Sequence, residues 1–224
     1  APLSRRRILY SLIGLAELVV VLLAVAQLVL PGIAADRLRR RLERSGQVLE
    51  VQVHAFPAIQ LLWQHADSVV VRMNSYTSNP GHLSGLLGQV GDIGSLDASA
   101  SRLQAGPLIL HNATLRKRGN TVTGTADVAE SDLRSVVPFL VNVTPVTSGG
   151  GRLTLQGTAS AFGLNATVDA TVSAQNGRLV IAPDVPLGGL ATITLFANPA
   201  LYVQGVSARS SPGGFTATAT ATLR

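Results

Sequence analysis

The side chains that could do chemistry are few and scattered along this chain. A histidine near an aspartate can serve as a base with its orienting partner, and His65 stands two residues before Asp67. We interpret this pair as part of a surface turn. The four histidines show no spacing typical of a metal site, and no nucleophile-elbow motif occurs. These histidines are His54, His65, His82 and His111.

The neighbouring carboxylates do not form a convincing acid pair. Asp127 precedes Glu130 and Asp132, and the last two belong at the start of a short helix, where carboxylates interact favourably with the helix dipole. The chain contains no cysteine, which excludes disulfides, thiolate metal sites, cysteine nucleophiles and a lipid-modified N-terminal cysteine. We therefore predict no catalytic residue, no metal and no cofactor, and we expect that the protein is not an enzyme.

The elements around these side chains are mostly strands. Apolar and polar residues alternate from Leu164 to Ala174, which is typical of a strand with one apolar face. The run from Leu153 to Ala161 alternates in the same way, and Phe162-Gly163 predicts a tight turn that joins the two runs as an antiparallel hairpin. A third alternating run, Phe215 to Leu223, closes the chain. Such an apolar face needs cover, either from a second sheet or from an apolar ligand.

The net charge of +6 is concentrated at the N-terminus. Residues 1 to 44 hold eight arginines against three acidic residues, whereas the remainder holds ten basic and nine acidic residues. The basic excess therefore flanks an apolar segment, where it suits anionic lipid headgroups. A nearly neutral remainder argues against a nucleic-acid partner.

The apolar segment runs from Ile8 to Leu30 after three consecutive arginines, and Glu17 is its only charge. Its length is sufficient to cross a bilayer. We interpret it as an uncleaved anchor, although Gly32 to Ala35 resembles a weak signal-peptide cleavage site. Counting arginines on either side favours a cytoplasmic domain, but long domains translocate largely regardless of charge.

Two helices are expected near this anchor. Pro31-Gly32 should end the membrane helix, and a basic helix from about Ala34 to Arg44 should follow it. Leu38 and Leu42 form a thin apolar stripe on that second helix, which suits contact with headgroups more than deep packing.

The domain then begins with a strand from Val48 to Ala55, which Pro57 ends. A short helix is expected from Ala58 to His65, with one apolar face, and a strand from Asp67 to Ser75 follows. The face of that helix carries Ile59, Leu62 and Trp63. Further strands are predicted around residues 96–103, 108–117 and 121–129, and a short helix over residues 130–137.

These motifs resemble the LmeA-like phospholipid-binding family of bacterial envelope proteins. Phe56-Pro57 with its short helix and the strand Val69 to Val71 match the start of the family domain, after an N-terminal membrane segment. The chain departs from the family at Ala58, where a large apolar residue is usual, and at His65-Ala66, where a glycine commonly ends the helix. Further similar stretches are Gly124 to Ala126, Ser131 to Leu133, Gly150 to Leu153, Gly205 to Ser207 and Pro212 to Phe215.

The resemblance implies an α+β, strand-dominated fold in which a long curved antiparallel sheet wraps a helix, as in tubular lipid-binding proteins. It implies a single-pass protein of the cytoplasmic membrane whose extracytoplasmic domain holds phospholipid acyl chains. We expect an anchor over residues 1–33, a basic juxtamembrane helix over 34–46 and a lipid-binding domain over 47–224. The alternative is a structural or partner-binding envelope domain with a closed core. Protein partners are not predicted.

The predicted lipid-binding side chains come from the first two strands, the short helix and the long hairpin. They are Val51, Val53, Phe56, Ile59, Leu62, Trp63, Val69, Val71, Leu153, Leu155, Val168 and Val172.

Overall fold

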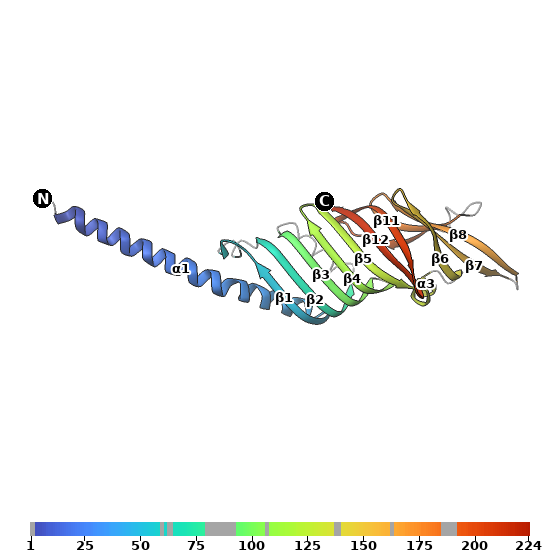
Figure 1. Ribbon diagram of the computed structural model, residues 1–224, viewed down its shortest axis with the longest axis horizontal. Coiled ribbons are helices and arrows are strands. Elements are labelled where there is room, and N and C mark those ends of the chain that lie inside the picture. Colours follow the sequence, from blue (N-terminus) through green and yellow to red (C-terminus); the bar gives the residue numbers. More distant parts are fainter. Residues whose placement is uncertain are drawn as a thin grey trace.

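A long helix leads into a domain built mainly of strands (Figure 1). The computed structural model describes residues 3–58, 61, 65–78, 93–105, 108–136, 140–161, 164–184 and 192–224. The helices are α1 (Leu3–Leu42) and α3 (Glu130–Val136). The strand-dominated α+β fold predicted from the sequence is confirmed.

The larger sheet has seven strands in the order β1-β2-β3-β4-β5-β12-β11. Neighbouring strands are antiparallel except for β2 and β3, which are parallel to each other. The sheet therefore differs in this one pair from the antiparallel sheet that we expected. Its strands are β1 (Gly46–His54), β2 (Ala66–Ser78), β3 (Ile93–Ala105), β4 (Leu108–Arg118), β5 (Thr121–Ala129), β11 (Leu201–Ser211) and β12 (Gly214–Leu223).

A second sheet of five antiparallel strands holds the long hairpin and follows the order β10-β9-β8-β7-β6. The hairpin pairs as predicted, with Leu153 opposite Val172 and Ala161 opposite Leu164. Its strands are β6 (Leu140–Gly149), β7 (Arg152–Ala161), β8 (Leu164–Gln175), β9 (Arg178–Pro183) and β10 (Ile193–Phe196).

The two sheets meet along β11. The amide of Val206 donates to the carbonyl of Gly151, and the amide of Val203 donates to the carbonyl of Gly177. A Cβ on Gly205 would lie 2.8 Å from Cα of Gly151, so this junction requires glycine. The turns of the second sheet are thereby fastened to the edge of the first.

Helix α1 does not end at Pro31, so the prediction of a break there is wrong. Proline removes one helical hydrogen bond, which favours a helix end when nothing else supports the helix. Here tertiary packing supplies that support, because Leu42 is buried in an apolar cluster with Val69 and Met73 on β2. Ala34, Ala35 and Leu38 pack against the same cluster.

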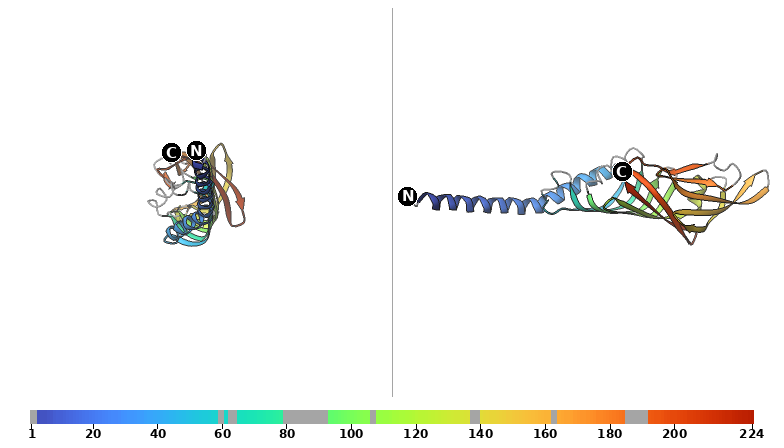
Figure 2. Two further views of the ribbon diagram at one scale, coloured as in Figure 1. Left: turned by 90° about the vertical axis from the view of Figure 1, so that its left-hand side faces the viewer. Right: turned by 90° about the horizontal axis from the view of Figure 1, so that it is seen from above.

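The same packing corrects our interpretation of the basic segment. Leu38 and Leu42 lie against the sheet, whereas we expected them to contact headgroups. The strands curl around this end of α1, as the end-on view in Figure 2 shows. The helix wrapped by the sheet is therefore the C-terminal part of α1, and the expected helix over residues 58–65 lies largely outside the described residues.

Upstream of this contact, α1 is apolar and exposed. The span from Leu18 to Leu42 has the length and hydropathy of a membrane-crossing helix, and none of its most apolar stretch is buried. An N-terminal signal sequence has the same properties. The helix is thus compatible with either a single-pass anchor or a signal peptide.

Candidate functional site

The inner face of the seven-stranded sheet is formed by rows of side chains that cross all its strands. Residues directly opposite each other on neighbouring strands project to the same face, so the register defines each row. The first row is buried throughout and is apolar except at its centre, where Lys117 lies. It consists of Val53, Val69, Leu96, Lys117, Val122, Ala221 and Val203.

The second row has valines at its edges and small residues on either side of its central Leu115. Gly124 has no side chain, and Ala219 and Ala98 carry only a methyl group. All three are partly exposed, unlike the residues of the first row. The row consists of Val51, Val71, Ala98, Leu115, Gly124, Ala219 and Val206.

Gly124 has room for a Cβ among the described residues. A Cβ added there would meet Leu115 Cδ1 at 3.8 Å and the Thr114 carbonyl oxygen at 3.9 Å, which are ordinary van der Waals contacts. Gly124 lies directly opposite Leu115 on one side and Ala219 on the other. Glycine at this position therefore leaves the sheet surface between Leu115 and Ala219 without a side chain.

A third row, which we call the alanine stripe, continues this lining, with an irregularity in the register between β4 and β5. Ala100 lies opposite Ala113, and Ala126 lies opposite Ala217, which in turn faces Ala208. These five strands span about 19 Å at a spacing of ~4.8 Å. One leaflet of a bilayer has a hydrocarbon depth of about 15 Å, so the stripe is longer than an acyl chain that spans one leaflet.

Each end of the inner face is filled by protein. At the β1 end, α1 and the first three strands form the apolar cluster that contains Leu42, Val69 and Met73. At the other end, Val128 and Phe215 pack against Leu155 of the second sheet. Ala100 packs against the first cluster, and Ala208 and Ala217 pack against the second. A third cluster, which contains Val122, Val203 and Ala221 and contacts Leu115, lies between them.

Lys117 is the only lysine of the chain, and it is 2% exposed. Its Nζ donates a hydrogen bond to the backbone carbonyl of Ile93, at the start of β3. Burial of an ammonium group is costly unless it is hydrogen-bonded, and this bond supplies one partner. Lys117 therefore ties β4 to β3 within an otherwise apolar row.

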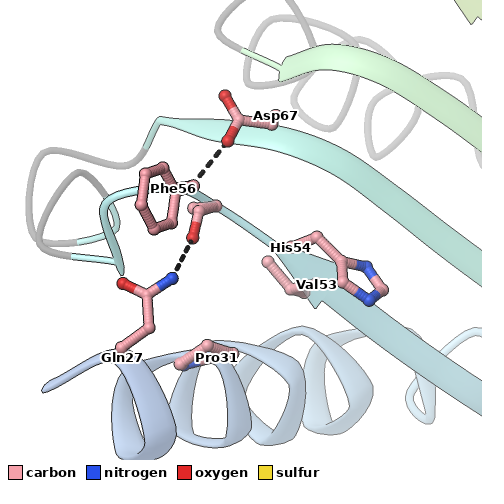
Figure 3. Close-up of a pocket in the computed structure, with 7 residues that line it drawn as sticks. Gln27, Pro31, Val53, His54, Phe56 and Asp67 are labelled. Atoms are coloured by element: carbon pink, nitrogen blue, oxygen red, sulfur yellow. Dashed lines mark hydrogen bonds between the residues drawn. The ribbon is translucent and has the colours of Figure 1, made fainter. Parts of the chain in front are cut away.

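A pocket of about 370 Å³ lies where α1 passes the end of β1, as Figure 3 shows. The Gln27 side chain bridges the loop after β1, since its Nε2 donates to the Ala55 carbonyl at 3.1 Å and its Oε1 accepts from the Ala58 amide at 2.7 Å. The Phe56 amide donates to Asp67 Oδ2 at 2.6 Å. The lining residues are Gln27, Pro31, Val53, His54, Ala55, Phe56 and Asp67.

The polar side chains on the other face of the sheet form hydrogen-bonded groups of their own. His111 Nε2 lies 2.8 Å from Asp132 Oδ2, which links β4 to α3. Asp127 accepts hydrogen bonds from Thr216 at 2.6 Å and Asn112 at 3.0 Å. These bonds, from Thr216 first and Asn112 second, lower the pKa of Asp127, and the charge of His111 adds a smaller effect.

Within the described ranges, no group of three His, Cys, Asp or Glu residues is placed to hold a metal ion. His54 is exposed beside the pocket, and the Asp67 carboxylate accepts a backbone amide at the loop. His82 lies outside the described residues.

The structure places the predicted lipid-binding residues in two separate groups. Val53, Val69 and Val71 are buried in the cluster at the β1 end, with Val51 packed against it. Leu153, Leu155 and Val172 are buried in the cluster between the sheets, with Val168 packed against it. Phe56 is exposed at the pocket, and Ile59, Leu62 and Trp63 lie outside the described residues.

These two groups are not brought together. Leu61, the described apolar residue of the expected short helix, packs in the cluster at the β1 end. The sequence-based hypothesis that this helix covers the hairpin is not supported by that placement. The role of the listed side chains in lipid binding stays a prediction.

Sequence analysis missed the centre of the inner face, including Gly124, Ala219 and the alanine stripe. The alternation of small and hydroxyl residues in β5 and β12 indicated two strands with small inward side chains. It could not indicate that these strands are neighbours, which is what joins their small side chains into one surface.

Comparison with known proteins gives one match. A sequence model of the LmeA-like phospholipid-binding family matches residues 23–220. No curated protein and no solved structure matches the chain.

Proposed function

The chain belongs to the LmeA-like phospholipid-binding family, and we propose that it holds a phospholipid acyl chain along the inner face of its seven-stranded sheet. The observation that carries this proposal is the apolar row through Gly124, which crosses every strand of the sheet and has room for a Cβ at Gly124 among the described residues. An acyl chain is long, narrow and apolar, and a lining of glycine and alanine leaves room for it. No catalytic step is needed for this function, and we propose a binding protein and not an enzyme.

The proposed lipid contact includes the predicted residues of the first two strands. Val51 and Val71 lie in the same row as Gly124, and Val53 and Val69 lie in the row beside it. We assign the acyl chain to the surface between these valines and Val206. The predicted hairpin residues would then lie at the far end of the domain, near the terminal methyl group of the acyl chain. They are Leu153, Leu155, Val168 and Val172.

We further propose that α1 anchors the protein in the cytoplasmic membrane with its domain on the extracytoplasmic side. Exposed leucines and valines along α1 support membrane insertion, because water would otherwise contact a large continuous apolar surface. The resemblance to envelope proteins supports the extracytoplasmic side, where the domain would serve lipid carriage or envelope maintenance.

Native mass spectrometry of the full-length chain, released from a mild detergent, tests the binding proposal. We expect bound phospholipid on the wild-type protein and much less on Gly124→Leu, whose side chain fills the proposed space. Gly149→Leu is the matched control, because a Cβ at Gly149 meets no atom within 4 Å and this residue lies in the second sheet.

Lipid that surrounds α1 should be the same in all three proteins, so only the difference between Gly124→Leu and the others reports the inner face. Equal lipid binding by wild type, Gly124→Leu and Gly149→Leu would contradict the proposal. It would favour a structural or partner-binding domain with a closed core.

A further inference from the structure

The loop between β1 and β2 presents a large aromatic side chain to its surroundings. Phe56 is 78% exposed, although phenylalanine is among the residues most often buried in folded proteins. Its backbone is not free, since its amide donates to Asp67 Oδ2 and the neighbouring Ala55 and Ala58 are both bonded to Gln27. The ring is therefore held outside the domain by a fixed loop.

Gln27 sets the height of this loop along α1. Gln27 lies three residues before Leu30, the end of the apolar run that begins at Ile8. Three residues correspond to a helix rise of about 4.5 Å. The next residue, Leu28, is 83% exposed. If lipid covers these helix side chains, it also reaches the level of Phe56, which Figure 3 shows beside Gln27 and not beside Pro31.

The pocket beside Phe56 adjoins the inner face at one residue. Val53 lines the pocket and also begins the first row of buried side chains, opposite Val69. Pro31 and Ala55 add apolar wall, while the Gln27 amide is occupied by its two loop bonds. An acyl chain that enters between α1 and the loop would first meet Val53, and the side chains of the cluster at the β1 end would have to part for it to reach the sheet. Asp67 is the acidic residue among those that line the pocket.

We propose that Ala55 to Ala58 inserts into the bilayer interface beside α1, and that the adjoining pocket is the portal through which a phospholipid acyl chain passes from the surrounding leaflet to the inner face. This inference rests on the proposed function, since it requires α1 to lie in a membrane and the inner face to hold lipid. Phe56 anchors the loop in the interface. Gln27 fixes the loop against the helix so that the portal lies at the level of the lipids.

The depth of the loop can be measured because the chain has no native cysteine to label. A nitroxide attached to Phe56→Cys in full-length protein in liposomes should collide with membrane-soluble oxygen more than with a water-soluble nickel complex. Val146→Cys is the control for exposed apolar residues, since Val146 is 52% exposed on β6 in the far sheet, and its label should show the reverse. Leu22→Cys, on the exposed part of α1, reports whether the helix is inserted.

The outcomes separate the portal from the anchor. A lipid-exposed label at Leu22→Cys together with a water-exposed label at Phe56→Cys overturns the portal and leaves the anchor intact. Water exposure at both positions overturns the anchor and the portal together.

Transfer of a fluorescent acyl-chain phospholipid from vesicles to the protein tests passage through the portal. Phe56→Ser should slow uptake on the order of tenfold, because the loop loses the aromatic ring that we propose lies in the lipid interface. The amount of phospholipid bound at equilibrium should stay unchanged. Gly124→Leu should instead lower the final amount. A Phe56→Ser protein that takes up lipid at the wild-type rate overturns the portal, whereas a wild-type protein that takes up no lipid contradicts the proposed function itself.

Discussion

Leu155 and Ala170 lie directly opposite each other on β7 and β8, and each is 1% exposed. They belong to the cluster that joins the two sheets, together with Phe215 and Val128 of the larger sheet. Their burial is provided by protein side chains. The hairpin that dominates the sequence pattern therefore helps to hold the sheets together.

Ala170→Trp should consequently destabilise the protein by about 1–3 kcal/mol, because a large side chain would overpack a closed cluster. Thermal denaturation of the full-length chain measures the effect. Ala166→Trp is the matched control, since Ala166 shares the same face of β8 but is exposed. Unchanged stability of Ala170→Trp with loss of bound lipid would place the ligand against the hairpin, as one interpretation of the sequence suggested.

Gly124→Leu should behave in the opposite way. Glycine in a strand interior costs roughly 0.5–1 kcal/mol relative to alanine, and a Cβ at Gly124 makes only ordinary contacts with the described residues. The free energy of unfolding should therefore stay within about 1 kcal/mol of the wild-type value in lipid-free protein. A much larger loss on chemical denaturation would show that the centre of the inner face is already filled.

The contrast between these positions shows what the sequence could and could not predict. Alternation identified β7, β8 and β12 as strands and identified which residues share a face in each, because the side-chain period of a strand is two. The pairing of Gly124 with Ala219 joins strands that are far apart in the chain. No local pattern specifies that pairing, so the inner face was missed.

The continuous helix through Pro31 was missed for a related reason. Local rules favour a break at proline, but the packing of Leu38 and Leu42 against the sheet depends on the tertiary structure. The same packing explains why the basic segment lies against the sheet and not at the lipid headgroups. By contrast, Phe56-Pro57 and the other short motifs along the chain together indicated the family that the match over residues 23–220 establishes.

Lys117→Ala should lower the free energy of unfolding by about 2 kcal/mol or more, because it removes a buried side chain and the hydrogen-bond donor to the Ile93 carbonyl. Arg116→Ala is the matched control, since the adjacent Arg116 side chain is exposed on the other face of β4. Chemical denaturation measures both variants. Equal stability of the two would show that the Lys117 bond contributes nothing to the fold.

Asp127 should make stability depend on acid pH. Its pKa in the folded protein lies below its ordinary value because Thr216 and Asn112 donate to its carboxylate. The ionised form therefore stabilises the folded state at pH values above the ordinary pKa, and this contribution disappears as the pH falls through the lowered pKa.

Between about pH 7 and pH 3, the wild-type protein should lose more thermal stability than Asp127→Asn, which has no ionisable group at this position. The measurement is the melting temperature of both proteins across that range. Parallel profiles would contradict the assignment of this pH dependence to Asp127.

The most direct test of lipid binding on the inner face is photo-crosslinking of the full-length protein in liposomes that contain a phospholipid with a photoreactive acyl chain. Peptide mass spectrometry then identifies the labelled strands. We predict adducts on inward-facing residues of β3, β4, β5 and β12, centred near Gly124 and Ala219. Adducts confined to α1 and to the outward-facing threonines of these strands would contradict the account.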